Sequence, residues 1–232
     1  MKADNIMIRL DSVALGYTHH AAVTDVSIAI TAGSLTAITG PNGEGKTTLL
    51  NTIVGFQSVL QGKLVINLPV SSIGYLSQNS GVDCRFPFTL FDFVSTGLWH
   101  RVGPQRAIRR DSRDAINLVL QQTGLSSMTR APLGMLSGGQ WQRARFARLI
   151  LQDSPLILLD EPFASIDEDT TADLLNIIHR WHAQGRTILA VLHDRRQILQ
   201  HFPQCLLFEQ GKVTHGESQI LLALAEVPRR IA

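Results

Sequence analysis

The stretch Gly40-Pro41-Asn42-Gly43-Glu44-Gly45-Lys46-Thr47-Thr48 decides how the rest of this sequence is interpreted. It fits the pattern G-x-x-x-x-G-K-[ST] of a phosphate-binding loop, the Walker A motif. Residues 34–39 before it are apolar and β-branched and predict a strand, and residues 48–54 after it predict a helix that Gly55 ends. A strand, this loop and a helix form the context that the motif requires, so we expect a nucleotide-phosphate site.

Each residue type in this loop has a chemical task at a phosphate group. Glycines permit backbone angles that bring N–H groups against phosphate oxygens, and the following helix N-terminus adds partial positive charge. We expect Lys46 to reach the β- and γ-phosphates and the Thr47 hydroxyl to ligate Mg²⁺. The loop residues expected to contact the nucleotide are Gly40, Asn42, Gly43, Gly45, Lys46, Thr47 and Thr48.

Length and composition describe one globular domain of moderate charge. The 232 residues suffice for one sizeable core, and 44% hydrophobic with 17% charged residues suits such a fold. A net charge of +2 is too mild to indicate nucleic acid by itself. The sequence contains neither an apolar run of membrane-spanning length nor a signal peptide core. Cys84 and Cys205 have no metal-ligand spacing and are expected to be reduced thiols, so we expect a cytoplasmic protein.

Alternating apolar residues predict a β-rich beginning of the chain. Strands are expected at residues 6–15, 23–30, 62–66 and 72–76, the last of which delivers Gln78. Tyr17 and the pair His19-His20 are expected in the loop between the first two strands. Two adjacent histidines without further ligands favour a solvated loop over a metal site.

Helical periodicity replaces this alternation between about residues 85 and 135. A capping box at Thr89 predicts a helix through Leu98, and residues 107–122 predict another that ends before Gly124. Arginines between residues 101 and 113 are interleaved with aspartates, which favours a solvated helix face over a nucleic-acid patch. We therefore expect one domain, residues 1–232, whose core (1–80 and 150–232) carries a helical subdomain inserted at about 81–149.

A second anion-binding helix end is predicted near the end of this insertion. Ser137 is a good N-cap, and the glycines after it leave the N–H groups of the following helix unobstructed. The four residues of this turn are Ser137, Gly138, Gly139 and Gln140.

Two carboxylates follow a buried strand. Residues 155–159 form a continuous apolar run that predicts a parallel strand, and Asp160 and Glu161 come directly after it. We expect Asp160 to bind Mg²⁺ through water and Glu161 to polarise a water for in-line attack on the γ-phosphate.

The remaining sequence predicts a helix at residues 170–184 and a second buried strand at 186–192 that ends at His193. A histidine at this end of a core strand, beside a phosphate site, is a candidate to contact the γ-phosphate. A hairpin at 205–214 and a helix at 218–225 complete the predicted domain.

Together these motifs resemble the nucleotide-binding subunit of ATP-binding-cassette (ABC) transporters over about residues 8–215. Residues 136–140, Leu-Ser-Gly-Gly-Gln, followed by residues 159–162, Leu-Asp-Glu-Pro, are close to diagnostic of that family. The resemblance implies an α/β fold: a P-loop NTPase (RecA-like) core with a mixed sheet, N-terminal antiparallel β-strands and an inserted helical subdomain. The implied cofactors are ATP and Mg²⁺.

The same resemblance implies roles for single residues. Tyr17 is similar to the aromatic residue that stacks on adenine, Gln78 to the glutamine that senses Mg²⁺ and the permease, and His193 to the switch histidine. It makes Gln78, Glu161 and His193 catalytic, and Thr47, Gln78 and Asp160 the Mg²⁺ residues. The family works as a head-to-tail homodimer in which residues 137–140 contact the ATP held by the partner's phosphate loop.

Departures from the family pattern are small. Glu44 stands where alanine is common and is expected to point outward, and Ala164 replaces a serine in the segment 164–167, the D-loop. Every residue expected for hydrolysis is present, so the resemblance implies two competent ATP sites in each homodimer.

The kind of ABC protein is indicated by what surrounds the motifs. A compact insertion, one cassette, no acid in residues 128–135 and no regulatory extension favour a free-standing importer subunit over exporter, repair or translation-factor relatives. Residues 82–99, which include Phe86-Pro87, resemble zinc and manganese importer ATPases in the segment where the permease docks. Zinc is favoured, with manganese and iron-siderophore or cobalamin importers as alternatives. The implied partners are an integral membrane permease and, indirectly, an extracytoplasmic metal-binding protein, at the cytoplasmic face of the bacterial inner membrane.

Two other classes stay open at this point. A non-transport ABC ATPase would act with nucleic acid or a soluble complex, although no nucleic acid is expected. A P-loop kinase would leave residues 136–140 unexplained.

Overall fold

The computed structural model describes residues 5–17, 20–78, 81–82, 87–103 and 108–225. Within them, six strands form a central sheet in the order β5-β6-β7-β3-β8-β9. The first five strands run parallel to one another and β9 is antiparallel to β8. The bounds are β3 Leu35–Thr39, β5 Ile73–Leu76, β6 Leu156–Asp160, β7 Thr187–Val191, β8 Gln204–Glu209 and β9 Lys212–Glu217.

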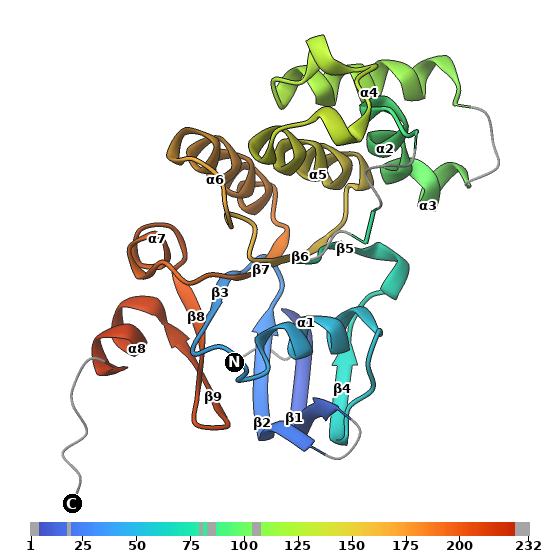
Figure 1. Cartoon of the computed structure of the whole chain (residues 1–232). Coiled ribbons are helices and arrows are strands. Elements are labelled where there is room, and N and C mark those ends of the chain that lie inside the picture. The colour runs from blue at the N-terminus through green and yellow to red at the C-terminus, as the bar shows by residue number, and fades with distance from the viewer. Residues whose placement is uncertain (1–4, 18–19, 79–80, 83–86, 104–107, 226–232) are drawn as a thin grey trace, which may run out of the picture.

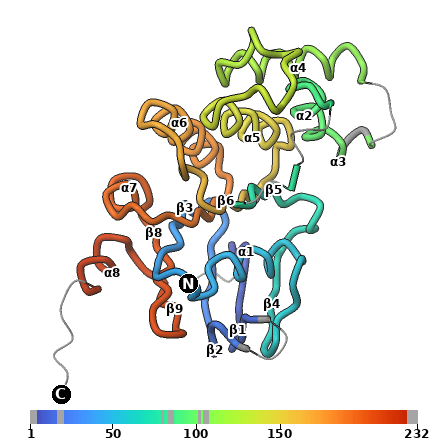
Figure 2. The backbone as a smooth tube through the Cα atoms, viewed as in Figure 1, coloured from blue at the N-terminus to red at the C-terminus, as the bar shows by residue number. Residues whose placement is uncertain are grey.

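The apolar runs of the sequence become strands that are buried on both faces. Every residue of β6 and β7 is buried. In β6, Leu156 and Leu158 join the apolar cluster on one face of the sheet, and Ile157 and Leu159 join the cluster on the other. Neighbouring strands of this sheet can be distant in the sequence: β3 lies beside β7 although about 150 residues separate them (Figure 2). A continuous apolar run is the expected pattern for such a central parallel strand.

A second sheet is antiparallel and has the order β2-β1-β4, with β1 Ile6–Tyr17, β2 His20–Thr31 and β4 Gln61–Ile66. Helix α1, Lys46–Val54, shares one apolar cluster with both sheets through Leu49, Leu50 and Ile53. The prediction that Tyr17 and His20 lie in the loop between the first two strands was wrong. Tyr17 ends β1 and pairs with His20, the first residue of β2, so the turn between them is shorter than expected.

Helices α2 Leu90–Ser95, α3 Trp99–Val102, α4 Arg110–Gln122 and α5 Gly138–Gln152 lie together at one end of the molecule (Figure 1). A third apolar cluster joins α2, α4 and α5. The capping box predicted at Thr89 is present. Gly97 lies in a 3₁₀ turn after α2, where a Cβ atom would collide with the Arg148 carbonyl oxygen of α5, so this close packing requires glycine.

Three further helices, α6 Glu168–Ala183, α7 Arg195–His201 and α8 Ser218–Ala225, cover one face of the central sheet. Asp167 and Asp194 cap the first two through their side chains. Helix α7 was not predicted, because it is short and buries only Ile198. The helix predicted at 107–122 begins at Arg110, and Ala107 lies outside the described residues. The fold is the mixed α/β arrangement with N-terminal antiparallel strands that the sequence predicted.

Among the described residues, no helix combines the length and apolar character needed to cross a membrane. Cys205 is a free, buried thiol whose burial raises its pKa to about 12, which agrees with an unreactive cysteine. Cys84 lies outside the described residues.

The burial of β6 predicts a large difference between two leucines. Leu158 is fully buried in the apolar cluster on one face of the sheet, and Leu118 on α4 is 55% exposed. We expect Leu158→Ala to lower the free energy of unfolding by about 2–5 kcal/mol through lost burial and a residual cavity. Leu118→Ala, the matched control, should change it by less than about 0.5 kcal/mol. Urea unfolding of the purified chain measures both, and equal effects would contradict the placement of β6 at the centre of the core.

Candidate nucleotide-binding site

The carboxyl ends of four neighbouring strands bring most of the predicted site residues to one edge of the sheet. In the order β5-β6-β7-β3, these strands lead into Gln78, Asp160 and Glu161, His193, and the phosphate loop at residues 40–45. Ligands of open α/β sheets bind outside this edge. A cleft of about 620 Å³ opens there. Its lining residues are Ala22, Asn42, Gly43, Gly45, Lys46, Thr47, Thr48, Gln78, Glu161 and His193.

The phosphate loop is held in an unusual backbone shape. Gly43 and Gly45 have φ angles of 85° and 93°, which glycine adopts without strain. A Cβ atom on Gly40 would collide with the carbonyl oxygen of Phe208 on β8, so the start of the loop also requires glycine. No side chain at these glycine positions covers the backbone of the loop, so its N–H groups can form an anion-binding nest.

Lys46 lies inside this loop. Its Nζ atom donates to the carbonyl oxygens of Gly40 at 2.8 Å and Pro41 at 2.7 Å. Burial lowers its pKa, and the carboxylates of Glu161 and Asp160 act in the opposite direction. The carbonyl groups of the phosphate loop thus hold the ammonium group of Lys46 at the cleft.

Glu44 is turned away from the anion-binding side of the loop. Its Oε2 atom accepts a hydrogen bond from the Gly211 backbone N–H at 2.9 Å, in the turn between β8 and β9. The carboxylate does not line the cleft, in keeping with the expected outward direction. An acid at this position can be accommodated because the hairpin turn holds it.

Asp160 presents a buried carboxylate beside the Thr47 hydroxyl. Thr47 Oγ1 donates to its Oδ1 atom at 3.3 Å, whereas Oδ2 is buried and has no hydrogen-bond partner in the described part of the chain. Burial raises the pKa of Asp160, and the Thr47 hydrogen bond opposes that shift. A hydroxyl beside a buried carboxylate suits Mg²⁺, which accepts few protein oxygens and completes its shell with water and phosphate.

Glu161 is held at both carboxylate oxygens. Gln78 Nε2 donates to Oε2 at 3.0 Å, and His193 Nε2 lies 2.9 Å from Oε1. The Glu161 backbone has a φ of 50°, which is uncommon for a residue with a side chain and is typical of functional sites. Glu161 therefore contacts both of the other residues expected to be catalytic.

Two predicted elements are not part of this cleft as the structure describes it. Residues 137–140 form a capping box at the start of α5, where Ser137 Oγ accepts from the Gln140 N–H at 3.3 Å. Position 138 faces Ser165 in the segment before α6, and position 139 faces Thr170 in the first turn of α6. The Tyr17 side chain lies outside the described part of the chain, so its expected contact with adenine stays a prediction.

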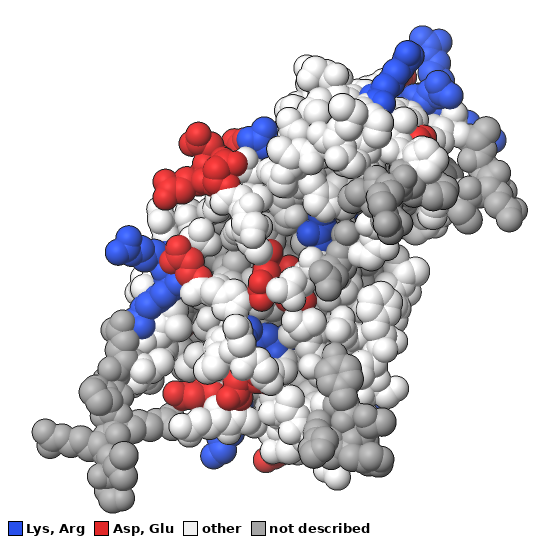
Figure 3. All heavy atoms as spheres, viewed as in Figure 1, with Lys and Arg blue, Asp and Glu red and all other residues white. Residues whose placement is uncertain are grey.

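Charges of both signs lie close together near the middle of the face drawn in Figure 3. Sequence reasoning did not identify Gln142 and Arg145, which join the backbone segments on both sides of this site. Neither residue belongs to a recognised motif. The sequence signal for a role of Arg145 was its position among the apolar residues that α5 turns toward the core.

The parallel sheet, the phosphate loop and the acids at the neighbouring strand end define the class of this protein: a P-loop nucleoside triphosphatase. Comparison with known proteins narrows the class. A family model described as "ABC transporter" matches residues 23–164, more than half of the chain. The chain therefore belongs to the ABC transporter family and is an ATPase.

Relatives in this family serve metal transport. The chain is 32% identical over 234 residues to the manganese transport system ATP-binding protein MntB of Listeria monocytogenes, covering 95% of this chain and 97% of the relative. It is 32% identical over 218 residues to the zinc transport system ATP-binding protein TroB of Treponema pallidum, covering 90% and 80%.

Solved structures confirm the fold. A putative metal-chelate type ABC transporter in an inward-facing conformation matches with a TM-score of 0.83 at 24% identity, covering 94% of this chain and 86% of that one. A nucleotide-free ATP-binding cassette matches with a TM-score of 0.79 at 21% identity and covers 96% of both chains.

The buried carboxylate of Asp160 predicts an unusual stability change. A carboxyl group whose pKa is raised by folding destabilises the folded state above that pKa, and the penalty disappears below the unfolded value of about 3.9. We expect Asp160→Asn to raise the unfolding midpoint of the nucleotide-free chain at pH 7, by a margin that shrinks toward pH 4. Thermal unfolding between pH 4 and pH 8, without Mg²⁺, measures this. The exposed control Asp114→Asn should show no such trend, and a lower midpoint for Asp160→Asn at pH 7 would contradict the assignment.

Proposed function

We propose that this chain is the ATP-hydrolysing subunit of a metal-ion importer, with zinc as the favoured ion and manganese as the alternative, and that it drives transport through a separate membrane permease. The observation that carries the proposal is the meeting of the phosphate loop and Glu161 in one cleft, with Asp160 bound to the loop residue Thr47 beneath it. The choice of metal ions is supported by the relatives that serve manganese and zinc transport systems.

The cleft has the donors needed to hold a triphosphate. In the proposed complex, loop N–H groups and the N-terminus of α1 bind phosphate oxygens, and Lys46 moves its ammonium group from the loop carbonyls to the β- and γ-phosphates. Thr47, Asp160 and Gln78 are the residues that would hold Mg²⁺. When bound, Mg²⁺ neutralises charge that develops on the phosphates.

Glu161 is the proposed base for hydrolysis. Its carboxylate would orient a water molecule in line with the γ-phosphate and accept a proton from it. Gln78 and His193 contact one carboxylate oxygen each, which fixes the plane of the group. His193 is 46% exposed and can turn toward a γ-phosphate once one is bound.

Residues 137–140 require a second chain in this proposal. They lie at the start of α5, away from the cleft of their own chain, and they present a second helix N-terminus for an anion. We infer a head-to-tail homodimer in the ATP-bound state, where this turn contacts the nucleotide bound by the partner.

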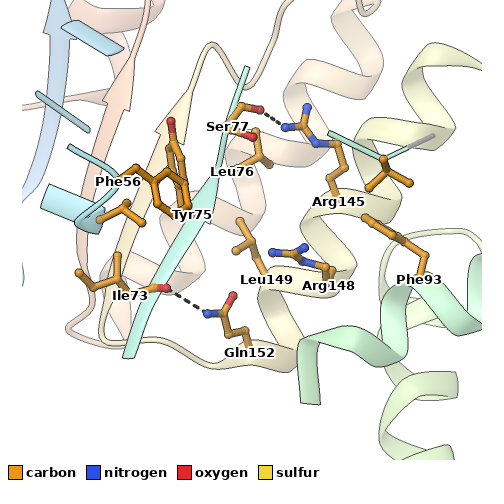
Figure 4. A pocket seen from close by; sticks show the side chains of 12 residues that line it. Phe56, Ile73, Tyr75, Leu76, Ser77, Phe93, Arg145, Arg148, Leu149 and Gln152 are labelled. Atoms are coloured by element: carbon orange, nitrogen blue, oxygen red, sulfur yellow. Dashed lines mark hydrogen bonds between the residues drawn. The ribbon is translucent and has the colours of Figure 1, made fainter. Parts of the chain in front are cut away.

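The permease contact is placed where the helical layer meets the core. A groove of about 450 Å³ lies there, and Figure 4 shows Phe56, Tyr75 and Phe93 around it. Phe56 is 74% exposed, and Trp99 beside an adjoining pocket is 46% exposed. Exposed aromatic side chains around a groove are typical of protein interfaces. We assign about residues 81–149 to a helical subdomain inserted between core segments 1–80 and 150–232, and this groove to the permease.

The assembly follows from this placement. The chain would sit at the cytoplasmic face of the bacterial inner membrane, bound to the permease, and an extracytoplasmic metal-binding protein would deliver the ion from the other side. The transported ion would not bind this chain. Among the described residues, no group of three or more His, Cys, Asp or Glu could hold a metal ion.

Replacement of Glu161 tests the proposed chemistry. We expect Glu161→Gln to retain ATP binding and to lower the hydrolysis rate by about 10²- to 10⁴-fold, because the amide cannot accept the proton. Release of phosphate and binding of a fluorescent ATP analogue measure the two properties. Glu168→Gln, an exposed glutamate in the first turn of α6, is the control. Normal hydrolysis by Glu161→Gln would refute the role.

Uptake of labelled metal tests the physiological substrate. In cells lacking this chain, we expect wild type to restore zinc accumulation and Lys46→Ala not to, because the loop loses its phosphate contact. The exposed control Lys63→Ala should restore uptake. Restoration of manganese alone would change the ion, and restoration of neither metal would direct the search to iron chelates or to a non-transport role.

A further inference from the structure

Arg145 joins two segments of the core to one point on α5. Its Nη2 atom donates to the carbonyl oxygen of Ser77, directly after β5, as Figure 4 shows. Its Nη1 atom donates to Gln142 Oε1 at 3.0 Å, one turn earlier on the same helix. The two donors of one guanidinium group therefore point in different directions, toward the strand and along the helix.

Gln142 extends this connection to the other side of the site. It is buried, and its Nε2 atom donates to the carbonyl oxygen of Pro162 at 2.6 Å. Pro162 follows Glu161, whose backbone has the uncommon φ of 50°. A backbone in that region persists when neighbouring contacts hold it, and the bond to the next peptide group is such a contact.

The Ser77 bond acts on the other half of the same constellation. The carbonyl group of Ser77 and the N–H group of Gln78 belong to one rigid peptide unit. That N–H group lowers the pKa of Asp160, and the Gln78 side chain donates to Glu161. Arg145 thus orients the peptide unit from which Gln78 reaches both acids.

This position is costly for a charged group. Burial and the neighbouring Arg148 lower the pKa of Arg145 to about 10, so the guanidinium group stays charged near neutral pH. In the described residues, its two hydrogen bonds go to a carbonyl and an amide oxygen, and neither goes to a carboxylate. A half-buried charge without a direct counter-ion among the described residues does not favour stability, and an apolar side chain would satisfy the packing.

We propose that Arg145 is a positioning residue for ATP hydrolysis, which holds the Ser77–Gln78 peptide and, through Gln142, the Glu161–Pro162 turn at a fixed separation. This inference rests on the roles proposed above for Gln78 and Glu161. Arg145 does not line the nucleotide cleft, so it acts on turnover and not on ATP binding.

The test is steady-state hydrolysis by the purified full chain. Lysine keeps the charge of Arg145 but has no planar fork that donates in two directions. We expect Arg145→Lys to lower kcat by about 10- to 100-fold, because small displacements of reacting groups have effects of this size. KM for ATP and the affinity for a fluorescent ATP analogue should stay within about twofold of wild type. Retained affinity also demonstrates that the variant is folded.

A double-mutant cycle separates positioning from general loss of packing. Gln142→Met has similar volume and cannot bridge Arg145 to Pro162. If the two residues act as one unit, the double variant should lose no more than the stronger single variant. Arg186→Lys is the matched control and should keep wild-type kcat. Arg186 forms its ion pair with Asp153 directly before β7, at the strand ends opposite the cleft.

Three results would overturn the proposal: kcat of Arg145→Lys within about twofold of wild type, a rise in KM in place of the fall in kcat, or losses that multiply in the double variant. The Glu161→Gln assay distinguishes its failure from that of the proposed function. Normal turnover in Glu161→Gln would remove the base, whereas an inactive Glu161→Gln beside a fully active Arg145→Lys would remove only the positioning role. Neither hydrolysis assay contains a transported metal, so the result of the uptake experiment does not change the interpretation of these two variants.

Discussion

The parallel pairing of β5, β6, β7 and β3 is the constraint on which the site depends. Thr47 and Asp160 are 113 residues apart in the chain, yet their side chains share a hydrogen bond because their strands end at the same edge of the sheet. Gln78 and Glu161, 83 residues apart, meet for the same reason. Parallel strands need long crossover connections. In this chain, those connections are the helices that cover both faces of the sheet.

The nucleotide site contains several groups that oppose folding. Asp160 has one buried oxygen without a partner among the described residues, Lys46 is buried within its own loop, and the backbone of Glu161 is in a sparsely populated region. The apolar clusters on both faces of β6 and β7 offset these costs, since every residue of these two strands is buried. The two strands that carry Asp160 and His193 at their ends are therefore also those with the deepest burial.

The sequence predicted the features whose causes are local. The capping box predicted at Thr89 and the N-cap predicted at Ser137 are both present, because a cap depends on residues within one turn of the chain. The members of the cleft other than Ala22 were also predicted, since each belongs to a motif, or is a single residue, that follows a strand end. Helix α7 was not, because seven residues with one buried side chain give too short an apolar pattern. The strand position of Tyr17 depends on irregular pairing between β1 and β2, which no local pattern records.

Contacts made across the tertiary structure were the part that sequence reasoning could not supply. Arg145 donates to a carbonyl oxygen 68 residues earlier, and Glu44 accepts from a backbone N–H group 167 residues later. Both partners are backbone atoms, and every residue type presents such atoms. The residue types at Ser77 and Gly211 therefore do not predict these two contacts.

Helix α5 connects the two functional ends that one chain is proposed to contribute. Its capping box at Ser137 would meet the nucleotide of the partner, and Arg145, about 12 Å further along the axis, holds Gln78 and Glu161 of its own site. The helix is continuous between these positions and packs on α2, α4 and α6. A shift of the Ser137 turn against the partner's nucleotide must then move Arg145 as well. In the proposed head-to-tail dimer, closure around one ATP would consequently adjust the residues that act on the other.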